Sequence, residues 1–231
     1  MPDFDALQEI IGYRFVNHEL LRQALVHRSY LNENPSFPLG HNERLEFLGD
    51  AVLELVVSDN LYRNYPNQEG DLTNWRASLV NAKSLSEVAR KLDIDQFLLL
   101  SRGESKDKAS KARQNIHANT VESIIGAMYL DGGIEPARKF IEQNILVHLP
   151  DILATEAYVD PKSRFQEMSQ EVFGVTPSYK VLREWGPDHD KQFEVSVNIG
   201  SEEIAIGSGA SKQEAQVAAA SAALKVKGWI S

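Results

Sequence analysis

Hydrophobic side chains recur every three or four residues through most of residues 17–148, which is the spacing of one buried helix face. The first stripe follows Asn17, whose side chain suits a helix N-cap. The three clearest stripes are Leu20, Leu21, Ala24 and Leu25; Leu45, Leu48, Val52, Leu55 and Val56; and Val121, Ile124, Ile125, Met128 and Tyr129. Because no strand-like alternation accompanies them, the pattern predicts an all-α domain over residues 1–153.

A polar segment, residues 102–114, interrupts the helical pattern. It has no hydrophobic period and carries five basic side chains against Glu104 and Asp107. We interpret this segment as a mobile, basic surface loop. A solvated connection without a binding partner accounts for the same charges, so the composition alone does not choose between the two interpretations.

The pattern changes beyond residues 154–159, which we interpret as a linker. Asp160 and Pro161 suit the N-cap and first position of a helix. Its expected buried stripe is Phe165, Met168, Val172 and Phe173. Alternating side chains then predict three antiparallel strands around residues 179–185, 193–199 and 204–206.

An alanine-rich helix is expected to close the chain. Ser211 and Glu214 have the spacing of a capping box in front of it. Its expected small-residue face, turned towards the sheet, is Ala215, Ala218, Ala219 and Ala222. Residues 160–231 should therefore form a small α+β domain of order α-β-β-β-α.

Composition limits the classes of protein to consider. The 231 residues include no cysteine, which excludes disulfides, thiolate zinc sites and cysteine nucleophiles. No apolar run approaches the roughly 18 residues of a membrane span, and the acidic start of the chain is unlike a secretory signal, so we expect a cytoplasmic protein without membrane attachment. The net charge of −9 by itself argues against a nucleic-acid partner, although residues 161–231 are close to neutral, with eight basic and nine acidic side chains.

The most informative polar residues are carboxylates. Glu43, Glu46 and Asp50 are spaced i, i+3 and i+7, so they share one helix face, where their like charges repel unless a cation neutralises them. Oxygen ligands of this kind favour Mg²⁺ or Mn²⁺. Glu122, three residues after Asn119, lies near an apolar face and needs either a shared metal ion or a basic partner. A solvated acidic face remains the alternative to metal-assisted hydrolysis.

Other catalytic patterns are missing from the sequence. It contains no glycine-rich phosphate loop, no serine-nucleophile elbow and no zinc-binding histidine spacing. No nucleotide cofactor is therefore expected.

The stretch HNERLEFLGDAVL, from His41 to Leu53, resembles the signature of the bacterial ribonuclease III family. Residues 24–30, 70–81 and 125–131 match the same family in order, and residues 160–231 are similar to a double-stranded-RNA-binding domain. The resemblance covers nearly the whole chain. It implies a homodimeric, Mg²⁺-dependent endoribonuclease, with Mn²⁺ as a substitute ion, that cleaves both strands of double-stranded RNA.

The resemblance also implies products and roles for residues. The expected products have 5′-phosphate and 3′-hydroxyl ends with short 3′ overhangs, and the expected roles are rRNA, mRNA and small-RNA processing. The implied catalytic pair is Asp50 and Glu122, the implied metal ligands are Glu46, Asp50, Asn119 and Glu122, and the implied supporting acidic residues are Glu43 and Glu69. The implied RNA contacts are Gln166, Glu167, His189, Ser211 and Lys212.

Two departures from the family pattern concern RNA binding. Ala210 and Gln213 stand where relatives usually have arginine and lysine. Each lost phosphate contact lowers affinity, so we expect weak, salt-dependent RNA binding.

The third departure is Asn119, where relatives normally have aspartate. Its amide oxygen can ligate a metal ion but brings no charge. The interpretations are an active natural variant with a raised metal requirement, an attenuated enzyme, and an engineered change that traps RNA. His117 also differs from the leucine common in relatives, which favours a natural variant. The alternative function is a weakened or silent homodimer that only binds double-stranded RNA; the intact Asp50 and Glu122 favour the enzyme.

Overall fold

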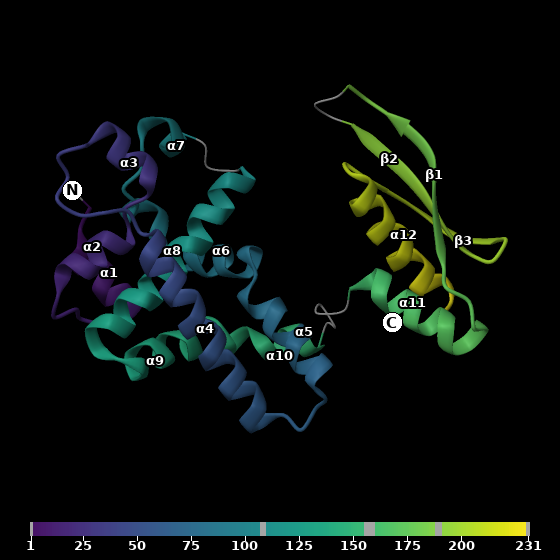
Figure 1. Ribbon diagram of the computed structural model, residues 1–231, viewed down its shortest axis with the longest axis horizontal. Coiled ribbons are helices and arrows are strands. Elements are labelled where there is room, and N and C mark those ends of the chain that lie inside the picture. The colour runs from purple at the N-terminus through teal and green to yellow at the C-terminus, as the bar shows by residue number, and fades with distance from the viewer. Residues whose placement is uncertain (1, 107–109, 155–159, 188–190, 230–231) are drawn as a thin grey trace. The chain divides into compact units, whose positions relative to one another are not determined.

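The computed structural model describes residues 2–106, 110–154, 160–187 and 191–229 (Figure 1). The chain forms two compact units, residues 1–158 and 159–231. Of the expected linker, only Ala154 lies within the described residues, at the end of helix α10 (Leu149–Ala154). No helix in the described part of the chain is long and apolar enough to span a membrane.

The first unit is built from helices, which confirms the predicted all-α class. Its other α-helices are α1 (Phe4–Ile11), α2 (His18–Ala24), α3 (Arg28–Glu33), α4 (Glu43–Asn64), α5 (Glu69–Val80), α6 (Ala82–Lys91), α7 (Arg102–Lys106), α8 (Lys111–Gly132) and α9 (Ile134–Asn144). Two 3₁₀ turns, η1 (Ile94–Phe97) and η2 (Leu146–His148), complete it. Asn17 caps α2 as predicted, because its side chain accepts a hydrogen bond from the Glu19 N–H.

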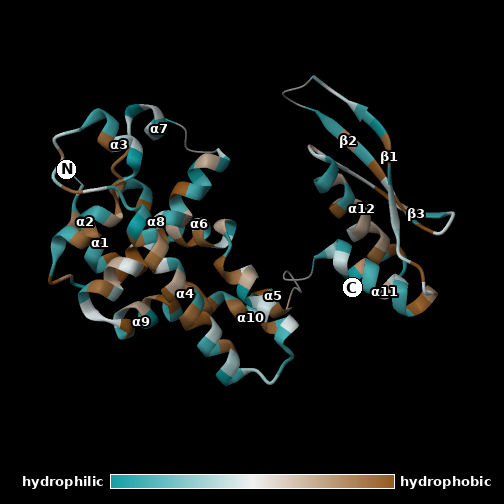
Figure 2. Cartoon of the chain, viewed as in Figure 1, coloured by the Kyte–Doolittle hydropathy of each residue, from teal (hydrophilic) through white to brown (hydrophobic). Residues whose placement is uncertain are grey.

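Helices α4 and α8 form the centre of this unit and pack along each other more extensively than any other pair of elements. Hydrophobic positions run through both helices (Figure 2). The predicted stripes are mostly buried, but Leu55 on α4 is 61% exposed and Tyr129 on α8 is 38% exposed. Both predictions of burial are wrong because each residue lies at the edge of its stripe, where the helix turns away from the core.

The predicted surface loop over residues 102–114 is largely helical in the described residues. Residues 102–106 form α7, and α8 begins at Lys111, capped by Ser110, whose side chain accepts a hydrogen bond from the Arg113 N–H. Arg113 is also buried, and its Nε donates to Asp95 Oδ1 at 2.8 Å. A buried ion pair with a distant residue is invisible in local composition, which explains the wrong prediction.

The second unit confirms the predicted α-β-β-β-α order. Its elements are α11 (Pro161–Phe173), β1 (Ser178–Trp185), β2 (Gln192–Ile199), β3 (Glu202–Gly209) and α12 (Lys212–Val226). The strands form one antiparallel sheet in the order β1-β2-β3. Asp160 caps α11 by accepting from the Ser163 N–H, and a Cβ on Gly207 would collide with the backbone of Ala219, so α12 lies directly on β3.

Two details of the second unit differ from expectation. On α11, Val172 and Phe173 are 53% and 47% exposed, whereas Ser169 is buried, because the short helix buries a narrower stripe. On α12, the predicted alanine face is rotated. The fully buried alanines are Ala215, Ala219, Ala220 and Ala223.

Candidate active site

Helices α4 and α8 cross where both carry glycine. A Cβ added to Gly49 would collide with the Glu122 carbonyl oxygen, and one added to Gly126 would collide with the Leu45 carbonyl oxygen. The two backbones therefore approach more closely than any other residue at these positions would allow. This contact brings Glu46 and Asp50, on α4, beside Glu122 on α8.

The three carboxylates affect one another electrostatically. Burial, and then the charges of Asp50 and Glu46, raise the pKa of Glu122 to about 8. Burial, and then the charge of Glu43, raise the pKa of Glu46, while a hydrogen bond from the Asn119 side-chain amide opposes this rise. The charges of Glu46, Asp50 and Glu122 thus act on one another, and these three residues with Asn119 are here called the carboxylate cluster.

Among the described residues, no lysine, arginine or histidine forms an ion pair with Glu46, Asp50 or Glu122. Glu46 and Glu122 are half-buried, and keeping such carboxylates charged costs free energy unless a cation or a proton neutralises them.

The chemistry of the donors fits a hard divalent ion. The side-chain atoms of the cluster that could ligate a metal ion are all oxygens, which Mg²⁺ and Mn²⁺ prefer as ligands. Within the described ranges, no three histidine, aspartate or glutamate side chains are grouped closely enough to hold a metal ion by themselves. Mg²⁺ characteristically binds through one or two carboxylates and keeps several waters, so a partial protein ligand set suits it.

The two supporting acidic residues lie differently. Glu43 begins α4 and lies near two basic residues: Arg28 Nη1 lies 3.8 Å from its Oε1 and His41 Nδ1 lies 3.7 Å from its Oε2. Glu69 begins α5 and lines a separate cavity with Tyr62 and Arg76. The structure thus places Glu43 one turn from Glu46 and does not group Glu69 with the cluster.

Residues outside the predicted set support the helices that carry the cluster. The buried Asn42 donates from Nδ2 to the Ala24 carbonyl oxygen at 3.2 Å, which fixes the start of α4 against α2. Ser123 Oγ donates to the Asn119 carbonyl oxygen at 2.7 Å. In the sequence, the signal for this close packing is the pair Gly49 and Gly126, because a glycine inside a helical pattern often marks a close backbone approach.

Of the RNA-contact candidates in the second unit, Gln166, Glu167 and Lys212 are exposed and Ser211 is half-buried. Gln166 and Glu167 lie on α11, where Glu167 faces Arg164 at 3.9 Å. Ser211 caps α12 by accepting from the Glu214 N–H at 3.1 Å, and Lys212 begins that helix. His189 lies outside the described residues.

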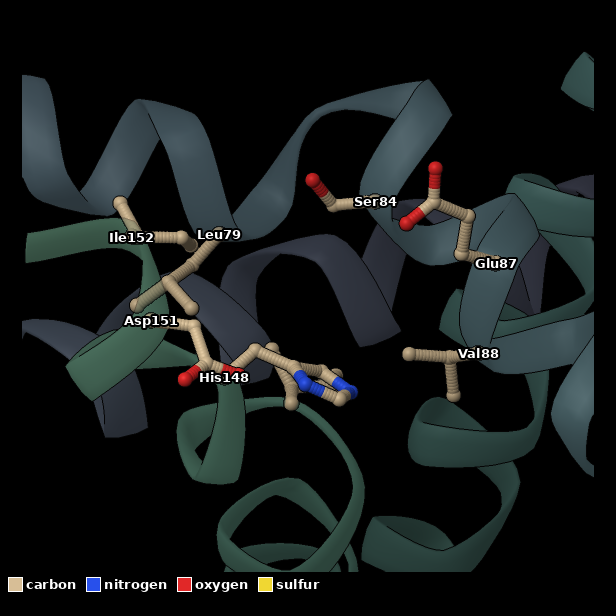
Figure 3. Close-up of a pocket in the computed structure, with 8 residues that line it drawn as sticks. Leu79, Ser84, Glu87, Val88, His148, Asp151 and Ile152 are labelled. Atoms are coloured by element: carbon tan, nitrogen blue, oxygen red, sulfur yellow. The ribbon is translucent and has the colours of Figure 1, made fainter. Parts of the chain in front are cut away.

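A separate cavity of about 270 Å³ opens between α5, α6 and α10, as Figure 3 shows. Its lining includes the apolar Leu79, Val88 and Ile152, with the His148 ring extending into it. Lys91 Nζ lies 3.1 Å from His148 Nε2. None of the predicted site residues line this cavity, and the carboxylate chemistry lies elsewhere.

The first domain is all-α and carries carboxylate oxygens on two crossing helices, and the second domain has the order α-β-β-β-α. This combination is typical of a class of two-domain enzymes that act on RNA, and comparison with known proteins agrees. The model of the Ribonuclease-III-like family matches residues 17–149, and that of the double-stranded RNA binding motif matches residues 161–227. The chain is 40% identical over 226 residues to Ribonuclease 3 of Dehalococcoides mccartyi, covering 97% of this chain and 95% of the relative. It is 44% identical over 222 residues to Ribonuclease 3 of Carboxydothermus hydrogenoformans, covering 96% and 94%.

Solved structures give the same result for the first unit. The nuclease domain of ribonuclease III from Campylobacter jejuni matches with a TM-score of 0.56 and 36% identity, covering 64% of this chain and 99% of that one. That structure is described as showing flexibility in a region involved in dimer formation. The chain belongs to the ribonuclease III family.

Proposed function

We propose that this protein is an endoribonuclease that hydrolyses both strands of double-stranded RNA, with Asp50 and Glu122 as its catalytic carboxylates. The observation that carries the proposal is the juxtaposition of Glu46, Asp50 and Glu122 at the glycine crossing of α4 and α8, without a protein cation among the described residues. Family membership supports the substrate class. The products are 5′-phosphate and 3′-hydroxyl ends with short 3′ overhangs.

The same residues would hold the metal ion. Mg²⁺, or Mn²⁺ in its place, would be held at Glu46, Asp50, Asn119 and Glu122, directly by one or two of the carboxylates and by the other side chains through its bound waters. When bound, the ion acidifies a water molecule and offsets negative charge on the scissile phosphate. Glu122, half-buried on α8, would accept a hydrogen bond from a water molecule at the reacting phosphate and so orient that water. Asp50 is exposed, so the RNA backbone can reach it.

The second unit would bind duplex RNA through its surface. The proposed contacts are Gln166, Glu167, His189, Ser211 and Lys212. A domain of this kind reads the shape, phosphates and 2′-hydroxyls of A-form RNA more than its sequence. Lys212 gains from the positive end of the α12 dipole, where an anionic phosphate is favoured.

We also propose a homodimer formed through α4. Phe47, Leu55 and Tyr62 form an apolar stripe on that helix and are 81%, 61% and 81% exposed, on the side away from Gly49. Large exposed apolar patches on a helix are typical of protein interfaces, and a two-fold axis would place one cluster on each side of a duplex. Sedimentation equilibrium tests this: the mass of two chains supports the dimer, and the mass of one chain overturns it.

Such an enzyme would act in rRNA, mRNA and small-RNA processing in the cytoplasm. Sequencing of RNA 5′ ends in cells that express or lack the protein would test these roles. Paired cuts across RNA helices, offset by a short 3′ overhang and lost without the protein, are expected. Unchanged ends would remove the processing role.

The direct test of activity uses a long, perfectly paired RNA duplex incubated with the full chain and Mg²⁺, Mn²⁺ or EDTA. We expect short duplex products with either metal ion and intact RNA in EDTA, on a denaturing gel. Intact RNA in every lane, together with a shifted band on a native gel, would instead establish a protein that binds without cleaving.

A further inference from the structure

Lys162, in the first turn of α11, is a half-buried cation outside the set of proposed RNA contacts. Its Nζ donates a hydrogen bond to Gln216 Oε1 on α12 at 2.7 Å and lies 5.1 Å from the centre of the Tyr179 ring on β1. An aromatic face at this distance attracts a cation. The ammonium group is therefore held between the two helices and the sheet by two uncharged partners.

These uncharged partners distinguish Lys162 from other basic side chains of the second unit. Four of those side chains form ion pairs with carboxylates: Arg164 with Glu167, Arg183 with Glu194, Lys191 with Glu184, and Lys227 with Glu202. Among the described residues, no carboxylate forms an ion pair with Lys162. A lysine ammonium has three hydrogens to donate, so Lys162 keeps its full charge and can donate to an anion as well as to Gln216.

Helix periodicity places Lys162 beside the proposed RNA contacts. Lys162 and Gln166 are four residues apart on α11, and Lys212 and Gln216 are four residues apart on α12. Side chains at this spacing share one face of a helix. The hydrogen bond between Lys162 and Gln216 therefore joins the face of α11 that carries Gln166 to the face of α12 that carries Lys212.

We propose that Lys162 is a further phosphate contact for double-stranded RNA, held in position by Gln216 and Tyr179. This inference rests on the proposed function, which makes duplex RNA the ligand of the second unit. Lys162 supplies a positive charge to a domain in which Ala210 and Gln213 stand where relatives usually have cations. Holding the long side chain in advance also reduces the conformational entropy that is lost when RNA binds.

Lys162→Gln tests this contact in the full chain, because a glutamine amide can still donate to Gln216 but carries no charge. Fluorescence anisotropy would measure binding of a short, perfectly paired RNA duplex in EDTA over a range of KCl concentrations. We expect Lys162→Gln to bind several-fold more weakly at low salt and to reduce the slope of log affinity against log salt by about 1. Lys162→Arg keeps the charge and should keep the wild-type slope.

The matched control is Lys225→Gln, which removes the same charge from an exposed position roughly 20 Å along α12 from Lys212. It should leave the slope unchanged. The inference is overturned if Lys162→Gln keeps the wild-type slope, or if Lys225→Gln reduces the slope equally. A purely structural role of Lys162 gives the first of these results, because a smaller folded fraction lowers the apparent affinity by a similar factor at every salt concentration.

These outcomes stay distinct from those of the proposed function. If the wild type binds the duplex and Lys162→Gln has an unchanged slope, the inference alone fails. If the wild type binds no duplex at any salt concentration, the proposed function fails together with the inference.

Discussion

The two domains carry their candidate functional residues in opposite ways. In the first domain, Glu46 and Glu122 are far apart in sequence, come together only where α4 and α8 cross, and are half-buried. In the second domain, Ser211 and Lys212 are neighbours at the start of one helix, and Lys212 is exposed. The first arrangement depends on tertiary packing, whereas the second depends on local helix capping.

This difference predicts how each region responds to change. In the carboxylate cluster, charge, burial and backbone contact are coupled, so one substitution alters catalysis, metal binding and stability together. At the RNA-binding surface, contacts with phosphates are solvent-exposed and contribute separately. Substitutions in the first region should therefore have large, coupled effects, and those in the second should have small, additive ones.

The largest expected effect follows from Glu122→Gln. Removing this carboxylate while keeping its shape should lower the rate of duplex cleavage about a thousandfold, because a neutral amide holds less strongly the divalent ion that would offset charge on the phosphate. RNA affinity, measured by native gel shift, should stay within about twofold, since the change lies outside the RNA-binding domain. Glu142→Gln, on the exposed face of α9, is the matched control and should cleave normally. Equal rates for the two variants would remove Glu122 from the site.

The second-largest effect is expected from Gly49→Ala. Its Cβ would collide with the Glu122 carbonyl oxygen, so the helices must separate. We expect the free energy of unfolding to fall by about 3 kcal/mol, as in other overpacked cores, and cleavage to be lost with it. Gly70→Ala on α5, where a Cβ meets open space, should instead be neutral or stabilising by roughly 0.5–1 kcal/mol. Chemical denaturation measures both; similar losses would contradict the close crossing.

The pH dependence of stability is a smaller effect. Folded Glu122 keeps its proton to about pH 8, whereas the unfolded chain loses it near pH 4.5. The folded state therefore binds more protons across this interval, and the free energy of unfolding in EDTA should fall as pH rises from about 4.5 to 8. The fall should be shallower for Glu122→Gln. Parallel curves for the two proteins would show that Glu122 titrates normally.

Lys212→Ala should have the smallest effect. Losing one phosphate contact should weaken RNA binding several-fold and reduce the slope of log affinity against log salt by about 1. Lys180→Ala, at an exposed position on β1, removes the same charge from a strand that carries none of the proposed contacts. If both variants shift binding equally, the domain attracts RNA by overall charge and Lys212 has no special position.

The same contrast explains what could be predicted from sequence. Local rules worked well: Asn17, Asp160 and Ser211 cap the helices they were expected to cap, and the order of strands and helices in the second domain is as expected. These features depend on neighbouring residues, which the sequence shows directly. The i, i+3 spacing of Asn119 and Glu122 likewise placed them together on α8.

The sequence does not predict features that depend on contacts between residues far apart along the chain. The sequence predicts that Arg113 lies in a mobile surface loop, but its partner Asp95 lies in η1, and no local pattern links the two. The rotation of the alanine face on α12 follows from the close approach of Gly207, which composition does not reveal.

The most direct measurement of the central claim is the anomalous scattering of a crystal of the full chain soaked in Mn²⁺. We predict a peak between α4 and α8, bordered by the side chains of Glu46, Asp50, Asn119 and Glu122. The peak should disappear in crystals of Glu122→Gln at the same Mn²⁺ concentration. A peak at another place in a protein that cleaves duplex RNA with Mn²⁺ would contradict the assignment of the active site.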